Sequence, residues 1–188
     1  KMNFLPIPVD ENIENLKVYE SKNRYKDIFF ALSHGVNYGS LKRGKVDERE
    51  DLINQLIRKY PKINYNFLGI GNEKPKWNYD FFDELLRTKM ALNLSRGKPL
   101  KYTSSNRIAA LIGNGIYTFI DKKNKFDDFF NENQVGSYKS IDDLGDKIEK
   151  LKSNPKLINQ YGKAGREKYF QLFNNKKISK NIIDIIYS

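Results

Sequence analysis

The sequence predicts an α/β protein built on a doubly wound, mostly parallel, Rossmann-like sheet. Short apolar runs alternate along the chain with segments of helical periodicity, which is the pattern of βαβ units. Several runs are continuously apolar, as expected for strands that helices cover on both faces. A chain of 188 residues is long enough for one such core. The predicted strands lie at about residues 28–33, 65–69, 90–95, 116–120 and 134–138.

The first predicted unit begins with residues 28–32 (IFFAL), which have the composition of a central strand. A long loop follows, and Asp47 with Glu50 three residues later resembles a capping box. We therefore expect a helix from Asp47 to about Tyr60, where Pro61 ends it.

The second unit has a short strand at residues 65–69 and a turn rich in glycine and asparagine. Phe81, Phe82, Leu85 and Leu86 then indicate a helix by their spacing. This helix leads directly into the third strand.

The stretch from residue 90 to residue 121 contains a strand, a polar loop, a helix and a further strand. Either Ser104 or Ser105 lies at the expected N-cap of the helix. Gly113 and Gly115 mark its end, because glycine allows the backbone to turn after a helix.

The chain after the fourth strand predicts a short helix at residues 126–130 and a last strand. Three longer helices follow. One is expected to be capped by Asp142, and one begins at Pro155, since proline suits the first turn of a helix. The last is an amphipathic helix at about residues 177–186.

The domain organisation is expected to be simple. Residues 1–25 are predicted to be a linker-like segment from a missing preceding domain, because Pro6 and Pro8 keep its first part extended and polar residues dominate the rest. Residues 26–188 are predicted to form one Rossmann-like domain.

Composition restricts the function classes. The chain has no cysteine, and His34 is its one histidine, so we expect no metal site of Cys or His ligands and no Ser–His relay. A Gly-x-Gly-x-x-Gly motif does not follow the first strand, which argues against a dinucleotide cofactor. The sequence shows no membrane-spanning run and no signal peptide, so a cytoplasmic location is expected.

The net charge of +11 suits a phosphorylated ligand or an anionic surface. Peripheral contact with the inner face of a membrane is therefore an expected partner interaction. The aromatic residues follow the apolar patterns and do not alternate with arginine, so we expect no nucleic-acid partner. A nucleic-acid or anionic-surface domain stays open as an alternative.

Two basic loops leave strands at their carboxyl ends, the edge at which α/β sheets bind ligands. The N-terminus of the predicted helix after residue 105 adds backbone N–H groups and partial positive charge. We therefore predict an anion site there. Its candidate residues are Ser95, Arg96, Lys101, Ser104, Ser105 and Arg107 from one loop and His34, Gly35, Lys42 and Arg43 from the other.

Residues 107–115 (RIAALIGNG), with a strand and Asp121 after them, resemble the donor-site helix of GT-B glycosyltransferases of the group 1 type. The similarity extends over most of the chain through several short motifs. These are residues 7–10 (IPVD), which resemble an interdomain linker, Phe129-Phe130, residues 141–144 (IDDL), Asn154-Pro155 and residues 161–166 (YGKAGR).

The resemblance implies the C-terminal, nucleotide-sugar-binding half of a two-domain enzyme, with any catalytic base on the missing domain. Such an enzyme transfers a sugar from a nucleotide diphosphate sugar to a glycan or lipid-linked acceptor, with no further cofactor, in cell-surface glycan synthesis. Thr103 and Ala110 occupy the positions at which many of these enzymes carry a pair of glutamates. A non-catalytic Rossmann-like nucleotide-binding or regulatory module stays open as a second alternative.

Overall fold

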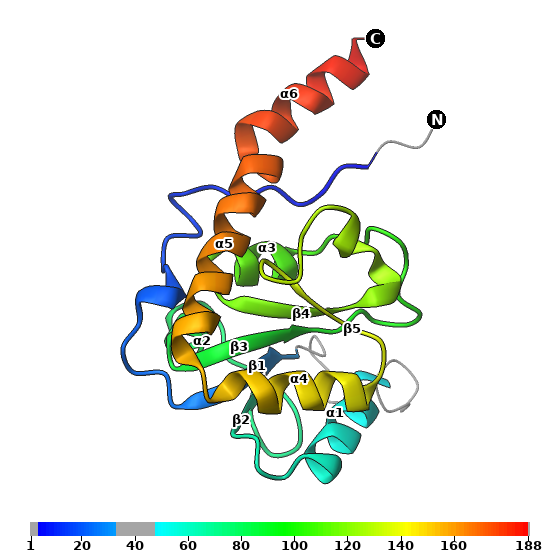
Figure 1. The fold of residues 1–188 in the computed structure, drawn as a ribbon. Helices are drawn as coiled ribbons and strands as arrows, with labels where there is room; N and C mark the ends of the chain where they lie inside the picture. Colours follow the sequence, from blue (N-terminus) through cyan, green and yellow to red (C-terminus); the bar gives the residue numbers. More distant parts are fainter. Residues whose placement is uncertain (1–3, 33–47, 188) are drawn as a thin grey trace.

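A computed structural model describes residues 4–32 and 48–187 (Figure 1). These residues form a sheet of five parallel strands in the order β2-β1-β3-β4-β5. The strand β2 lies on one side of β1, whereas β3, β4 and β5 follow on its other side. The sheet is therefore doubly wound, and the predicted fold class is confirmed. The strands are β1 (Lys26–Ala31), β2 (Tyr65–Leu68), β3 (Thr88–Asn93), β4 (Tyr117–Asp121) and β5 (Gly136–Tyr138).

Helices cover both faces of this sheet (Figure 1). One face packs against α1 and α4, and the other packs against α2, α3 and the second half of α5. The helices are α1 (Glu48–Lys59), α2 (Asn78–Leu86), α3 (Asn106–Gly113), α4 (Ile141–Lys152), α5 (Pro155–Phe173) and α6 (Asn175–Ile186).

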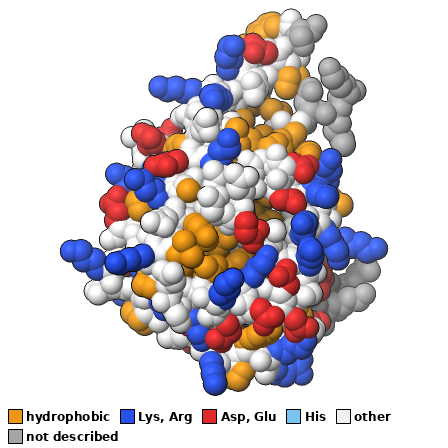
Figure 2. Space-filling model, in the orientation of Figure 1, with side chains coloured by type: hydrophobic (Ala, Val, Ile, Leu, Met, Phe, Trp, Pro, Cys, Tyr) orange, Lys and Arg blue, Asp and Glu red, His pale blue; other side chains and the backbone are white. Residues whose placement is uncertain are grey.

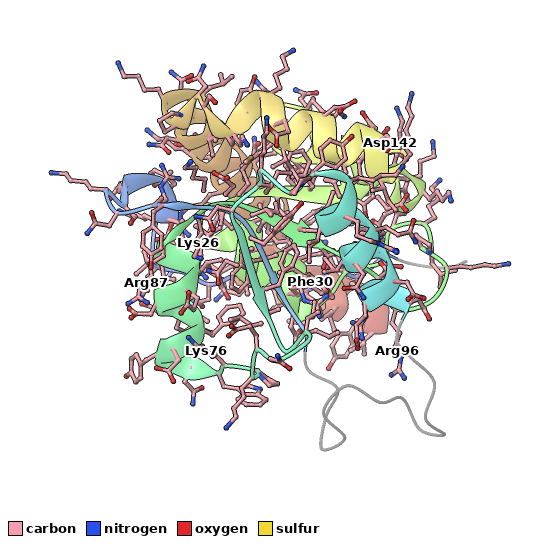
Figure 3. The ribbon with its side chains drawn as sticks, turned by 90° about the horizontal axis from the view of Figure 1, so that it is seen from below. Lys26, Phe30, Lys76, Arg87, Arg96 and Asp142 are labelled. Carbon is pink, nitrogen blue, oxygen red and sulfur yellow. The ribbon has the colours of Figure 1, made fainter. Side chains whose placement is uncertain are left out.

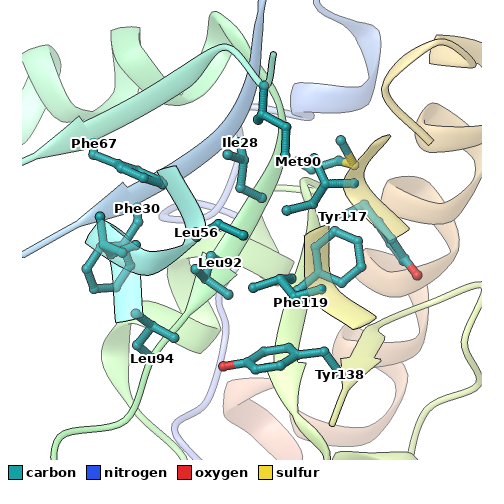
Figure 4. Packing of buried hydrophobic residues seen from close by; sticks show 14 of the residues in the cluster. Ile28, Phe30, Leu56, Phe67, Met90, Leu92, Leu94, Tyr117, Phe119 and Tyr138 are labelled. Carbon is teal, nitrogen blue, oxygen red and sulfur yellow. The ribbon is translucent and has the colours of Figure 1, made fainter. Parts of the chain in front are cut away.

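Successive side chains of a central strand enter different cores, because strand side chains alternate between the faces of a sheet. Ile28 and Phe30 of β1 pack toward α1 and α4, whereas Phe29 between them packs toward α2 and α3. The first of these cores also holds Tyr117 and Phe119 of β4, and Figure 4 shows their rings side by side. Burial on both faces explains why the strands were recognisable as continuous apolar runs.

The helix starts confirm most of the expected positions and correct one. Ser105 is the N-cap of α3 and accepts a hydrogen bond from the backbone N–H of Ile108. The cap of α4 is Ser140, not Asp142, because the Ser140 hydroxyl accepts the N–H of Asp143 at 3.1 Å. Asp142 lies inside the first turn, where its carboxylate is 2.6 Å from the ammonium of Lys59.

Two further predictions concern the short helix after β4 and the cap of α1. The short helix expected at residues 126–130 is a 3₁₀ turn at Phe126–Asp128. The expected capping residue Asp47 lies outside the described residues.

The segment before β1 lies against the domain. Val9 is buried and pairs through its backbone with Phe173 and Asn175, at the junction of α5 and α6. Val18 is fully buried in the core that contains α2 and α3. Residues 4–25, which include a 3₁₀ helix at Val18–Glu20, thus contribute side chains to the core.

The contact that holds the last helices to the sheet is very close. Gly162 of α5 lies against the backbone of Gly115, and Gly165 lies against the backbone of Gln134, with no room for a Cβ at either position. Arg166, one residue further, is buried and donates to the carbonyl oxygens of Gly113 and Glu14. This contact joins α5 to the end of α3 and to the N-terminal segment.

Replacement of Gly162 by alanine should therefore destabilise the protein. The added methyl group would meet a backbone carbonyl, so helix and strand must move apart, and we expect the free energy of unfolding to fall by about 1–3 kcal/mol. Chemical denaturation would measure it. Lys163→Ala, at the next and exposed position of the same helix, is the matched control and should change stability by less than about 0.5 kcal/mol. An equal effect of the two substitutions would contradict the close contact.

Candidate anion-binding site

A cavity of about 610 Å³ lies at the carboxyl end of β3, beside the start of α3. Four cationic side chains line it: Arg49, Arg96, Lys98 and Arg107. None of the described residues that line it carries a carboxylate. Figure 3 shows Arg96 well away from Lys26 and Arg87, which mark the amino-terminal edge of the sheet.

This concentration of one charge differs from the pattern on the face shown in Figure 2. On the face shown in Figure 2, lysine and arginine side chains are dispersed, with aspartate and glutamate between them. Opposite charges that are interspersed in this way cancel at short range. The cavity is therefore a local region of positive potential, suited to an anion.

The N-terminus of α3 adds to this potential. Ser105 has an extended backbone at the N-cap, and the first turn of α3 contains no acidic residue. The partial positive charge of the helix end is therefore not neutralised within its own first turn. Backbone N–H groups in that position are an established type of phosphate site.

Arg107 lies in the same first turn, and its guanidinium group is held from two sides. It donates to the carbonyl oxygen of Leu94 at 3.1 Å, and its central carbon lies 5.1 Å from the ring centroid of Phe30. A cation at a helix N-terminus is unfavourable against the helix dipole. These contacts fix the side chain beside the cavity, where a bound anion would reverse the sign of that interaction.

Ser104 also lines the cavity, but its hydroxyl belongs to a connection with the N-terminal segment. The hydroxyl oxygen accepts the backbone N–H of Ile7 at 2.8 Å, and Tyr169 donates to the carbonyl oxygen of Ile7 at 3.1 Å. Burial raises the pKa of Tyr169 to about 12, and a hydrogen bond with Ser104 opposes this rise. Ile7 thus becomes part of the cavity wall.

The loop that precedes α3 carries the remaining candidates of the sequence. Ser95 and Arg96 line the cavity, whereas Lys101 is not among its lining residues. The ammonium of Lys101 lies 4.5 Å from the ring centroid of Tyr102. The hydroxyl of Tyr102 in turn donates to Asp128 at 2.5 Å, which holds this part of the loop toward the 3₁₀ turn.

Of the sequence candidates, the structure brings together Ser95, Arg96, Ser104, Ser105 and Arg107. His34, Gly35, Lys42 and Arg43 lie outside the described residues.

The lining residues that sequence reasoning missed include Arg49, Lys98 and Asn93. Arg49 lies in the first turn of α1, which begins at the same edge of the sheet because it follows β1. That topology could have indicated Arg49 as a site residue, but the neighbouring acidic residues Glu48 and Glu50 made a cationic site there less evident. Lys98 belongs to the same polar loop as Arg96, and its charge alone could have indicated it.

Metal-ligand groups and membrane-spanning helices both bear on function. The described residues contain no group of three or more histidine, aspartate or glutamate side chains placed to hold a metal ion. Within the same part of the chain, no helix has both the length and the apolar character needed to cross a membrane.

Comparisons with known proteins agree with the fold. The model of the glycosyl transferase-like family matches residues 47–184. TarM aligns with 99% of this chain and 38% of its own, with a TM-score of 0.61 and 15% identity. Sucrose-phosphate synthase from Thermosynechococcus elongatus aligns with 97% of this chain and 45% of its own, with a TM-score of 0.56 and 15% identity.

The chain thus spans less than half the length of either structure. A comparison with curated protein sequences gives no significant match. The two structural similarities, at 15% identity, concern the fold, whereas the family match concerns the sequence itself over most of its length. The chain belongs to the glycosyl transferase-like family and has the Rossmann-like fold of the C-terminal half of a group 1 GT-B glycosyltransferase.

Proposed function

We propose that the cavity at the carboxyl end of β3 binds the diphosphate of a nucleotide diphosphate sugar, and that the protein transfers this sugar to an acceptor hydroxyl. The observation that carries the proposal is the convergence of four cationic side chains on the N-terminus of α3. The cavity volume of about 610 Å³ lies within the range of small-molecule sites, about 300–1,000 Å³.

The chemistry fits these groups. When a sugar leaves its nucleotide, the bond from the anomeric carbon to the diphosphate oxygen breaks and negative charge grows on that oxygen. Donors already fixed in position stabilise such charge most effectively, because they do not reorganise during the reaction. Arg107, held by Leu94 and Phe30, is a donor of this kind, and the N–H groups of α3 are another.

Transfer itself is proposed for the whole protein. TarM and sucrose-phosphate synthase are each more than twice as long as the part that aligns here. We propose that the acceptor, a glycan or lipid-linked hydroxyl, binds mainly to a part of the enzyme beyond this chain. The isolated chain would then bind donor nucleotides but release no diphosphate from sugar nucleotides above background.

The isolated chain should bind nucleoside diphosphates, and it should do so in the presence of EDTA, because its own cations surround the cavity. Calorimetric titration with UDP, GDP, ADP, CMP and NAD would measure the affinities. We expect at least one diphosphate to bind more tightly than the monophosphate CMP, since a second phosphate adds charge to neutralise. Preference for NAD, or no binding at millimolar concentration, would contradict the proposed function.

Arg107→Gln tests the placement of the diphosphate. Glutamine keeps an N–H for the Leu94 carbonyl but removes the charge, so the fold should persist while the affinity for the bound diphosphate falls about 10- to 100-fold. Lys101→Ala is the control, because Lys101 is not a lining residue, and it should change affinity less than about threefold. Thermal melting of both variants separates binding from stability. If the control variant loses as much affinity as Arg107→Gln, the diphosphate is bound elsewhere.

A further inference from the structure

Asn93 is the last residue of β3 and lies below the start of α3. Its place follows from the alternation of the strand. Ala91, two residues earlier, packs in the core that contains Leu111 of α3, and side chains two apart point to the same face. Leu92 and Leu94 on either side of Asn93 pack in the opposite core. Asn93 therefore faces α3 at the point where the strand ends and the cavity begins.

Among the described residues, the buried side-chain amides of Asn93 and Asn124 each have an oxygen without a hydrogen-bond partner, and of the two only Asn93 lines the cavity. The Asn93 side chain is only 4% exposed, and its Oδ1 atom is buried with no hydrogen-bond partner in the described part of the chain. A buried acceptor without a partner costs about 1–3 kcal/mol of stability. An apolar side chain would avoid that cost, and both neighbours in the sequence are leucine. The fold alone gives no reason for an amide here.

A ligand that donates a hydrogen bond to the amide would supply a reason for its presence. Guanidinium and ammonium groups are donors only, so the four cations of the cavity can bind phosphate oxygens but cannot accept from a hydroxyl. Two hydroxyl oxygens of the lining are already engaged within the chain: Ser105 accepts from Ile108, and Ser104 accepts from Ile7. Asn93 therefore provides a buried acceptor in a cavity surrounded by donors.

We propose that Asn93 Oδ1 accepts a hydrogen bond from a sugar hydroxyl next to the bound diphosphate, and that this residue selects ligands that carry such a hydroxyl. The inference rests on the proposed function, since it takes the diphosphate to lie against Arg107 and α3. The hydroxyl belongs either to the ribose of the nucleotide or to the sugar that is transferred. Both present the same chemistry to the amide.

The test compares Asn93→Leu with the unchanged chain by calorimetry. The probes are inorganic pyrophosphate, the nucleoside diphosphate that binds best among UDP, GDP and ADP, its 2′,3′-dideoxy form, and the matching glucose or mannose nucleotide. Pyrophosphate has no hydroxyl, so its affinity should change less than twofold. A ligand that donates to Asn93 should bind about 3- to 10-fold more weakly to the variant.

The probes also identify the hydroxyl. If the ribose donates, the nucleoside diphosphate weakens and its dideoxy form binds both proteins equally. If the transferred sugar donates, only the sugar nucleotide weakens. Asn93→Ala, which also lacks the acceptor, repeats the comparison should the leucine variant fold poorly.

Stability provides a second readout. Because Asn93→Leu removes an unpartnered buried polar group, the ligand-free variant should melt no lower than the unchanged chain. Asn66→Leu is the matched control: Asn66 is also buried, but its amide donates to Thr88 Oγ1 at 2.8 Å. That variant should melt at a lower temperature and keep its affinity for every probe.

Two outcomes would overturn the inference. Unchanged affinity of Asn93→Leu for every probe, with a lower melting temperature, would show that the amide binds a buried water and serves the fold. An equal loss for pyrophosphate and for the nucleotides would show that it acts on the phosphates. If the unchanged chain binds pyrophosphate but no nucleotide, or binds nothing, the proposed function itself fails and this inference fails with it.

Discussion

The rest of the structure depends on the close contact between α5 and the sheet. Gly162 and Gly165 allow the helix to lie directly on backbone atoms, and Arg166 donates to the last turn of α3. Carbonyl groups at the end of a helix lack partners within it, so a buried arginine satisfies them and neutralises the negative end of the dipole. Since α3 is fixed at its C-terminus, the position of its N-terminus, where the cavity lies, is fixed as well.

The N-terminus of the same helix, beside the cavity, differs from its C-terminus. The first turn of α3 contains no acidic residue, and Arg107 lies in it. The buried Oδ1 atom of Asn93 has no hydrogen-bond partner in the described residues. A cation in the first turn opposes the helix dipole, and a buried acceptor without a partner costs stability. Under the proposed function, a bound phosphorylated sugar would compensate both. Local interactions that conflict with folding are typical of functional sites.

The fold was largely predictable because its signals are local. Apolar runs identified all five strands, and the N-cap serine, the prolines and the glycines located most helix ends. The site was predictable where it lies on one continuous stretch, from Ser95 to Arg107. Arg49 and Asn93 depend instead on which loops meet at the sheet edge and which face a strand residue takes. Lys101 lies apart from the cavity because Tyr102 has a left-handed backbone, with φ of 58°, that no residue pattern indicated.

The absence of the glutamate pair affects how the proposed site would recognise a nucleotide. Of the two positions at which the resemblance implies a glutamate, Thr103 lines the cavity and Ala110 is not among the lining residues. No described residue that lines the cavity carries a carboxylate, so the proposed recognition of a diphosphate would depend mainly on charge. Exposed charges are screened over about 8–10 Å at physiological salt, so the exposed Arg96 and Lys98 contribute less there than the fixed Arg107. Under the proposed function, selectivity among nucleotides must then come from uncharged groups, and the buried amide of Asn93 is placed to supply it.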